Sequence, residues 1–158
     1  MFKDFNISSF KKMKPPSDNG YTTHTELNEL KKIPLNKSFV KKFDNIESAF
    51  AKVAKDNNVE DYDKKIAANL IKDSAPVILK LKEYHNRPRP KNLDKKMPNY
   101  EMASMKTKSY PSGHSVQGIL IAKVLGDKHP KAKSAFAKTG ENISYSRRVA
   151  RAHYKSDS

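Results

Sequence analysis

Hydrophobic residues along much of the chain recur three and four positions apart, the spacing that places side chains on one face of a helix. The pattern is clearest in a run that comprises Phe39, Phe43, Ile46, Phe50 and Val53. A second helical stretch is predicted for about 62–84, where Pro76 should kink the helix or open a new first turn. A shorter helix is expected near 26–32, ended by Pro34.

The pattern changes in the second half of the chain. Residues 86–111 lack periodicity and contain four prolines, and so long a loop in a compact domain is usually functional or disordered. Ser112 is expected to cap a helix that Gly126 can stop. A last helix should run from Pro130 towards the C-terminus, with Gly140 tolerated at some cost. Since no strand alternation is found, the predicted fold class is all-α, a single-domain compact helical bundle.

The N-terminal segment differs from the rest because it is rich in proline and small polar residues. We expect residues 1–24 to form a flexible arm and residues 25–158 to form one domain. The composition, 36% hydrophobic and 31% charged, is typical of a soluble protein, and no apolar run is long enough to cross a bilayer. No secretory signal is visible, which favours the cytoplasm, and the lack of cysteine excludes disulfides and thiolate metal sites.

Charge is concentrated in the second half of the chain. The net charge is +15; residues 1–79 hold 14 lysines and 11 acidic residues, whereas residues 80–158 hold 13 lysines, 5 arginines and 6 acidic residues. All the arginines therefore lie in the second half, although lysine is the usual cation of the chain. The guanidinium is a planar fork that fits phosphate oxygens, so this placement indicates anion binding. A generic basic surface for nucleic acid or anionic membrane is the alternative, for which lysine would serve.

The last predicted helix would carry charge on its inward face. At about 100° per residue, one arc of about 120° contains Ile143, Arg147, Ala150, His153 and Asp157. Burying charged groups without a partner is costly. An anionic ligand or another protein group is therefore expected to meet them.

Three clusters in the second half carry the candidate chemistry. They are Lys82 with Arg89-Pro90, then Pro111-Ser112-Gly113-His114, and then Ser146-Arg147 with His153 and Asp157. Together they provide three cations, two histidines, a hydroxyl, a carboxylate that can pair with a histidine, and a helix N-terminus. This combination suits a phosphoryl group.

The order and spacing of the clusters resemble the signature of the type 2 phosphatidic acid phosphatase superfamily, most closely its soluble branch, the bacterial class A non-specific acid phosphatases. The resemblance covers about half the chain, from Lys80 to the end. The spacing of the first cluster also occurs slightly earlier in the chain, in Lys80 with Arg87-Pro88. Lys82 with Arg89 resembles the acid phosphatase branch better. The resemblance implies a helical bundle of the acid phosphatase type.

The resemblance also implies a phosphohistidine mechanism without a cofactor or a metal. His153 would attack phosphorus, Asp157 would orient His153, and His114 would protonate the leaving oxygen and later activate water. The phosphoryl oxygens would be bound by Lys82, Arg89, Ser112, Gly113 and Arg147. Vanadate is expected to bind as an inhibitor that mimics the transition state.

Two departures from the family pattern affect the expectations. Arg151 stands where soluble members usually have glycine, which would add charge and bulk beside the nucleophile. The sequence ends at Ser158, whereas the family normally continues into a final core helix that this chain would lack. We therefore expect Asp157 to be held only intermittently, and either self-association, with a homodimer favoured, or a low-activity monomer.

The remaining polar residues are assigned to structural or surface positions. Ser146 should support the helix or orient Arg147, and Tyr84 and Tyr110 either flank the pocket or pack in the core. Three arginines are expected to be solvated charges or loop anchors rather than ligands: Arg87, Arg148 and Arg151. Surface positions are expected for His24, His85 and His129.

The leading function is hydrolysis of small soluble phosphate esters. A second enzymatic function, vanadate-dependent halide oxidation, shares the same site in the resembling superfamily. A third alternative is a non-catalytic protein that binds nucleic acid or another polyanion. The chain lacks the run of aromatic residues among exposed lysines and arginines that would favour nucleic acid.

Overall fold

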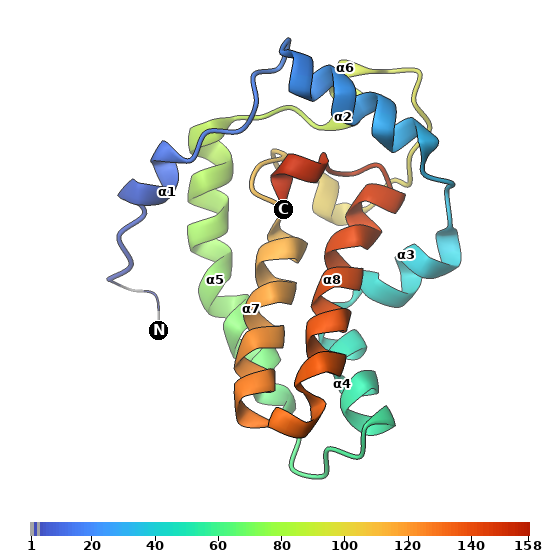
Figure 1. The fold of residues 1–158 in the computed structure, drawn as a ribbon. Coiled ribbons are helices and arrows are strands. Elements are labelled where there is room, and N and C mark those ends of the chain that lie inside the picture. The colour runs from blue at the N-terminus through green and yellow to red at the C-terminus, as the bar shows by residue number, and fades with distance from the viewer. Residues whose placement is uncertain (1, 3) are drawn as a thin grey trace.

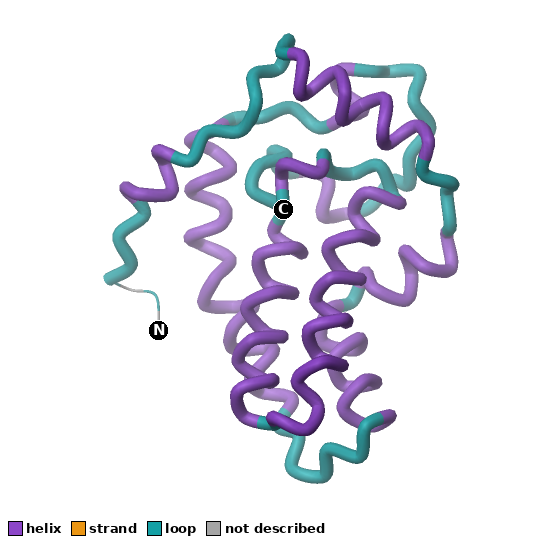
Figure 2. Tube along the Cα trace, in the orientation of Figure 1, coloured by secondary structure: helices purple, strands orange, loops and turns teal. Residues whose placement is uncertain are grey.

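The computed structural model describes residue 2 and residues 4–158, and all the regular structure in this part of the chain is helical (Figure 1 and Figure 2). This confirms the predicted all-α class. The α-helices are α1 (Ser8–Lys12), α2 (Tyr21–Lys32), α3 (Lys37–Asp44), α4 (Ile46–Asp56), α5 (Lys64–His85), α6 (Pro90–Leu93), α7 (Gly113–Lys128) and α8 (Lys133–Val149). Three short 3₁₀ turns lie at Ala103–Lys106, Pro130–Ala132 and Lys155–Asp157. Among the described helices, none combines the length and the apolar character that a membrane span needs.

Helices α7 and α8 form an antiparallel pair at the centre of the molecule (Figure 1). Helix α5 packs against α7, while α3 and α4 pack against α8. Two glycines allow the central pair to approach closely. A β-carbon on Gly140 would lie 2.9 Å from the carbonyl oxygen of Gly118, so glycine is required at this crossing rather than merely tolerated. The close approach brings the N-terminus of α7 beside the C-terminal end of α8.

The main core fills the space between these helices. Its buried residues come from both halves of the chain and include Phe43, Phe50, Leu70, Ile121, Leu125, Phe136 and Ile143. The hydrophobic periodicity of the sequence therefore predicted the inward faces correctly.

Two smaller cores hold the segment that follows α8. On one side, Tyr154 packs with Leu27 and Leu30 of α2 and with Met97. On the other side, Val40 of α3 packs with Val149, Ala150 and Ala152. His153 lies between the residues that these two clusters bury, so the backbone that carries it is held from both sides.

Several element boundaries differ from the sequence-based prediction. The hydrophobic run 39–53 is divided between α3 and α4 at Asn45, whose side chain accepts a hydrogen bond from the Ser48 amide and so caps α4. Helix α7 continues past Gly126 to Lys128, and α5 continues through Pro76. Helix α2 begins at Tyr21, so it crosses the predicted boundary at residue 24 between arm and domain.

The largest difference is at the end of α8, where the prediction of a helix continuing to Asp157 is wrong. The Ala152 amide donates to the Arg147 carbonyl and the Arg151 amide donates to the Arg148 carbonyl, the pattern of a Schellman C-cap. Arg151 is the left-handed residue of this cap, with φ 56°. Glycine is the usual residue at such a position, which explains why arginine gave no stop signal in the sequence.

Candidate active site

The three sequence clusters converge at one end of the bundle. Lys82 comes from the last turns of α5, Arg89 directly precedes α6, Ser112 caps α7, and Arg147 lies in the last turn of α8. His153 lies in the turn that follows α8, and Asp157 lies in the short 3₁₀ helix Lys155–Asp157 after that turn (Figure 1). All six of these residues are buried.

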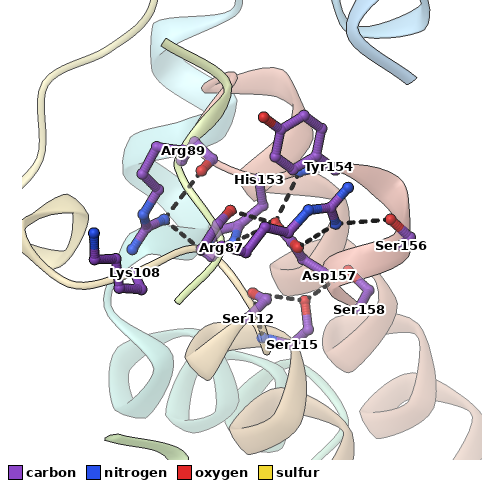
Figure 3. A network of polar contacts seen from close by, with 12 residues as sticks. Arg87, Arg89, Lys108, Ser112, Ser115, His153, Tyr154, Ser156, Asp157 and Ser158 are labelled. Carbon is purple, nitrogen blue, oxygen red and sulfur yellow. Dashed lines mark hydrogen bonds and ion pairs between the residues drawn. The ribbon is translucent and has the colours of Figure 1, made fainter. Parts of the chain in front are cut away.

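His153 is held between a carboxylate and a guanidinium (Figure 3). Its Nδ1 lies 3.0 Å from Oδ2 of Asp157, and its Nε2 lies 2.7 Å from Nη1 of Arg89. Because a guanidinium can only donate, Nε2 must be the acceptor, and the ring proton must lie on Nδ1. The contacts therefore fix the tautomer in which Nε2 carries no proton and its lone pair accepts the hydrogen bond from Arg89.

Asp157 is anchored more firmly than the sequence suggested. It is 1% exposed, and its Oδ2 accepts hydrogen bonds from His153, from the Tyr154 amide at 3.0 Å and from the Ser109 hydroxyl at 2.5 Å. Its Oδ1 accepts from Arg87 at 2.7 Å, and its carbonyl accepts from the Ser112 amide at 2.8 Å. The expectation of an intermittently held carboxylate does not match this geometry.

Burial controls the charge of this pair. Burial lowers the pKa of His153 to about 3; the hydrogen bond to Asp157 acts in the opposite direction, and the positive charges of Arg89 and Lys82 add smaller lowering effects. Burial alone would raise the pKa of Asp157, yet its hydrogen bond to His153 and the charge of Arg87 hold that pKa below the usual value. Near neutral pH, His153 is therefore a neutral imidazole beside the ionised carboxylate of Asp157.

Arg89 and Lys82 are aligned by backbone carbonyls. Arg89 donates to the carbonyls of Thr107, Ala152 and Ser104, and Lys82 donates to the Lys108 carbonyl at 2.6 Å. Burial, and secondarily the charge of Arg89, lowers the pKa of Lys82 to about 7. Burial likewise lowers the pKa of Arg89 to about 10. The long loop 94–108 thus serves to orient two cations.

The N-terminus of α7 supplies further donors. Ser112 is fully buried, and its hydroxyl oxygen accepts from the Ser115 amide at 3.3 Å and from the Ser115 hydroxyl at 3.0 Å. The predicted N-cap is therefore confirmed. Gly113 is the first residue of α7, so its amide belongs to the first turn, which has no intrahelical acceptor. Such amides favour anions.

His114 and Arg147 meet a residue that the sequence analysis did not single out, Asp44. Nε2 of His114 donates to the Asp44 carbonyl at 2.8 Å, and Nη1 of Arg147 lies 3.2 Å from Oδ1 of the same residue. Burial and the charge of Arg147 lower the pKa of His114 to about 4. Asp44 ends α3, 103 positions before Arg147, and nothing in its local sequence marks it as a site residue.

A comparison with curated proteins tests the family resemblance. The chain is 37% identical to the non-specific acid phosphatase of Salmonella typhimurium (strain LT2) over an alignment of 79 residues, and the match covers 48% of this chain and 32% of that protein. The chain is similar to an acid phosphatase. The match covers about a third of the length of this relative. No protein-family model matches the chain.

The similarity to an acid phosphatase confirms the resemblance inferred from the clusters, while the individual residue roles stay predictions. The structure does distinguish the two alternative lysine–arginine pairs by position. Lys80 is exposed and Arg87 faces Asp157, whereas Lys82 and Arg89 are buried and Arg89 contacts Nε2 of His153. The preferred pair is therefore the one that lies with the other candidate residues.

The assignments of the remaining residues have mixed outcomes. Arg151 acts as a loop anchor, since it donates to the carbonyls of Pro98, Lys31 and Ile33. It therefore points away from His153 rather than crowding it. Ser146 accepts a hydrogen bond from Nε of Arg147 at 3.2 Å, as expected for a residue that orients the arginine.

The surface position expected for His129 is wrong, and of the two alternatives given for Arg87 the solvated charge is wrong. His129 is 9% exposed, because it packs near Phe136 at the end of α7. Arg87 is 1% exposed, because Asp157 and the ring of Tyr154 surround its guanidinium. The burial of Arg87 could not be inferred from local polarity, since Asp157 lies 70 positions away in the sequence.

Among residue 2 and residues 4–158, no group of three or more histidine, cysteine, aspartate or glutamate side chains is arranged to hold a metal ion. The carboxylates at the site are paired with histidine or arginine. The side chains gathered at the site offer imidazole, carboxylate, guanidinium and ammonium groups.

Proposed function

We propose that this protein is a phosphatase that hydrolyses phosphate monoesters of small soluble molecules through a phosphohistidine intermediate at His153. The observation that carries the proposal is the environment of His153. Asp157 fixes the proton on Nδ1, and the lone pair of Nε2 faces a guanidinium suited to phosphate oxygens. The similarity to an acid phosphatase gives independent support.

In the first step, Nη1 of Arg89 exchanges its hydrogen bond to Nε2 for one to a phosphoryl oxygen, and the lone pair of Nε2 forms a bond to phosphorus while the ester P–O bond breaks. The departing oxygen takes a proton from His114. The pKa of free His114 is low, but a bound phosphoryl dianion opposes the charges of Arg147 and Arg89 and so raises that pKa. Asp157 retains the Nδ1 hydrogen bond and stabilises the positive charge that the ring of His153 gains.

In the second step, a water molecule attacks phosphorus and the P–Nε2 bond breaks. Neutral His114 accepts the proton of the water, so that orthophosphate leaves and both histidines return to their starting states. The same residue thus serves as acid in one step and as base in the next.

The cations would stabilise the charge on the transferred group. Arg89 and Arg147 are permanent charges held by protein oxygens, and Lys82 adds a third near neutral pH. Nη2 of Arg147 is buried and, within the described part of the chain, has no hydrogen-bond partner. A phosphoryl oxygen would satisfy it. These interactions stabilise an oxyanion without requiring a divalent metal.

The test is hydrolysis of p-nitrophenyl phosphate by the purified chain from acid to neutral pH, in excess EDTA. Turnover should survive the chelator, and vanadate should compete more tightly than phosphate because it adopts a five-coordinate geometry. His153→Ala should abolish turnover, whereas the neighbouring half-buried Arg148→Ala should retain it. Full activity in His153→Ala would refute the nucleophile assignment.

His114→Ala separates the two roles of that histidine. It should retain more activity on p-nitrophenyl phosphate, whose leaving group needs no proton, than on an alkyl phosphate, whose leaving group does. Equal losses on the two substrates would contradict the assignment of His114 as the general acid.

A further inference from the structure

Arg87 has no part in the reaction proposed above, yet it is one of the most deeply buried side chains of the protein. It lies two residues before Arg89, in the segment between α5 and α6. The two arginines point to different partners: Arg89 reaches His153, and Arg87 reaches Asp157 and Ser156 (Figure 3).

The guanidinium of Arg87 is engaged on several sides. Nη1 donates to Oδ1 of Asp157 at 2.7 Å and to the Ser156 hydroxyl at 2.9 Å. Nη2 lies 3.3 Å from the Thr23 hydroxyl and 3.7 Å from Oε2 of Glu26. The plane of the group lies 3.9 Å from the centre of the Tyr154 ring. Such a set of contacts allows one orientation of the guanidinium.

This orientation divides the two oxygens of Asp157 between different partners. Oδ1 is occupied by Arg87, which leaves Oδ2 for His153, Ser109 and the Tyr154 amide. A carboxylate with both oxygens engaged cannot rotate without breaking charge-assisted hydrogen bonds. Arg87 therefore holds Oδ2 towards Nδ1 of His153.

Helix α2 completes the support. Glu26 accepts hydrogen bonds from the Ser156 amide at 3.1 Å and from the Ser156 hydroxyl at 2.6 Å. Ser156 is the residue before Asp157, so α2 holds both the backbone next to the carboxylate and the arginine bound to it. The acidic and hydroxyl groups of α2 thus connect an N-terminal helix to the candidate nucleophile.

We propose that Arg87 is a positioning residue that acts through Asp157 to keep His153 in its nucleophilic form. The inference rests on the proposed function for its role in catalysis, but its structural part, control of the ring of His153, does not need turnover. The spacing of the sequence clusters does not predict this role, because it offers Arg87 only as a member of an alternative ligand pair with Lys80.

Electrostatics gives the direction of the expected effect. The loss of a nearby cation favours protonation of both a carboxylate and an imidazole, so the pKa of Asp157 and the pKa of His153 should both rise without Arg87. Besides Arg87, the charged or titratable groups that face this pair include Lys82 of α5, Arg89 before α6, Glu26 of α2, Tyr154, and Tyr110 before α7. These groups remain in the variant, so the change can be assigned to Arg87.

The experiment compares Arg87→Met and Arg87→Lys with Arg151→Met and Arg151→Lys. Arg151 is a matched control, because it is also a buried arginine near the C-terminus but donates only to the carbonyls of Pro98, Lys31 and Ile33. The titration of the His153 ring is followed by nitrogen NMR of histidine-labelled protein, with the signal assigned by His153→Gln. The acid limb of kcat/KM is measured on the same samples.

We expect Arg87→Met to raise the pH at which the His153 ring protonates and to move the acid limb of kcat/KM to higher pH. By analogy with groups that orient metal-binding histidines, kcat/KM should fall by about 10- to 100-fold. Arg87→Lys keeps the positive charge but not the planar guanidinium with its several donors. It should therefore shift the titration of His153 less than Arg87→Met does, while still lowering kcat. The Arg151 variants should leave the His153 titration in place.

If Arg87→Met does not fold, the comparison of Arg87→Lys with Arg151→Lys tests the inference instead. A His153 titration and a kcat equal to those of the Arg151 variants would overturn the inference, even if the wild-type protein is an active phosphatase. If the wild-type protein lacks phosphatase activity, the proposed function fails, while a shift of the His153 titration in the Arg87 variants would still support the positioning role.

Discussion

At the scale of single residues, burial changes the charges on which phosphate binding depends. Lys82 illustrates this, because its pKa is lowered to about 7 by burial and by Arg89, against the effect of Asp157. Its ammonium group therefore loses its charge as the pH rises through that value. Arg89 and Arg147 keep theirs throughout.

The first prediction follows from this titration. We compare kcat/KM of the wild type with that of Lys82→Met across a range of pH. At about one pH unit below the pKa of Lys82, the wild type should exceed the variant by the largest factor, and this factor should decline towards one as the pH rises above the pKa. Using the ratio cancels the titration of the substrate. The exposed neighbour Lys80→Met is the control and should give a ratio near one at every pH. A ratio for Lys82→Met that does not change with pH would contradict the assignment.

The second prediction concerns Asp44, whose carboxylate lies 3.2 Å from Arg147 and 3.6 Å from His114. It competes with a phosphoryl group for Arg147, so Asp44→Asn should tighten phosphate and vanadate inhibition. Because the side chain is half exposed, we expect a gain of about three- to tenfold. Asp127→Asn, at the far end of α7, should leave the inhibition constants unchanged. Weaker inhibition in Asp44→Asn would contradict the argument.

At the scale of elements, the hydrophobic pattern predicted the helices and their buried faces but not all of their ends. Periodicity reports which face is buried, whereas an end depends on a few backbone hydrogen bonds. Asn45 and Arg151 show the difference. Asn45 divides a continuous hydrophobic run by capping α4, and Arg151 ends α8 in a left-handed conformation that glycine usually adopts. The predicted helical face with Arg147, His153 and Asp157 was wrong, although His153 and Asp157 do contact each other.

The third prediction tests the crossing of α7 and α8. A β-carbon on Gly140 would meet the backbone oxygen of Gly118 at 2.9 Å, so Gly140→Ala should destabilise the protein by about 1–3 kcal/mol despite its better helix propensity. In Gly126→Ala the nearest atom is Cγ of the Lys133 side chain at 3.0 Å, which can move. Denaturant unfolding should show a clearly larger loss for Gly140→Ala. Equal losses would mean that the helices adjust at little cost.

At the scale of the whole molecule, the sequence predicted which residues gather at the site, but it predicted their contacts less well. The order and spacing of three clusters indicated Lys82, Arg89, Ser112, His114, Arg147, His153 and Asp157, and the fold brings them to one end of the bundle. The sequence indicated neither the place of Asp44 at the site nor the contact of Arg87 with Asp157, for the same physical reason. Their roles come from partners about 70 or more positions away, and such pairs are created by packing rather than by local pattern.

The measurement that tests the central claim most directly is capture of the phosphoenzyme. Wild-type protein is mixed with an excess of phosphorus-32-labelled substrate and quenched with alkali, in which phosphohistidine survives. The account predicts label on the protein that is stable to alkali, lost in acid and absent from His153→Ala, while His114→Ala accumulates it with a good leaving group. Turnover without labelled protein, or equal labelling of His153→Ala, would contradict catalysis through His153.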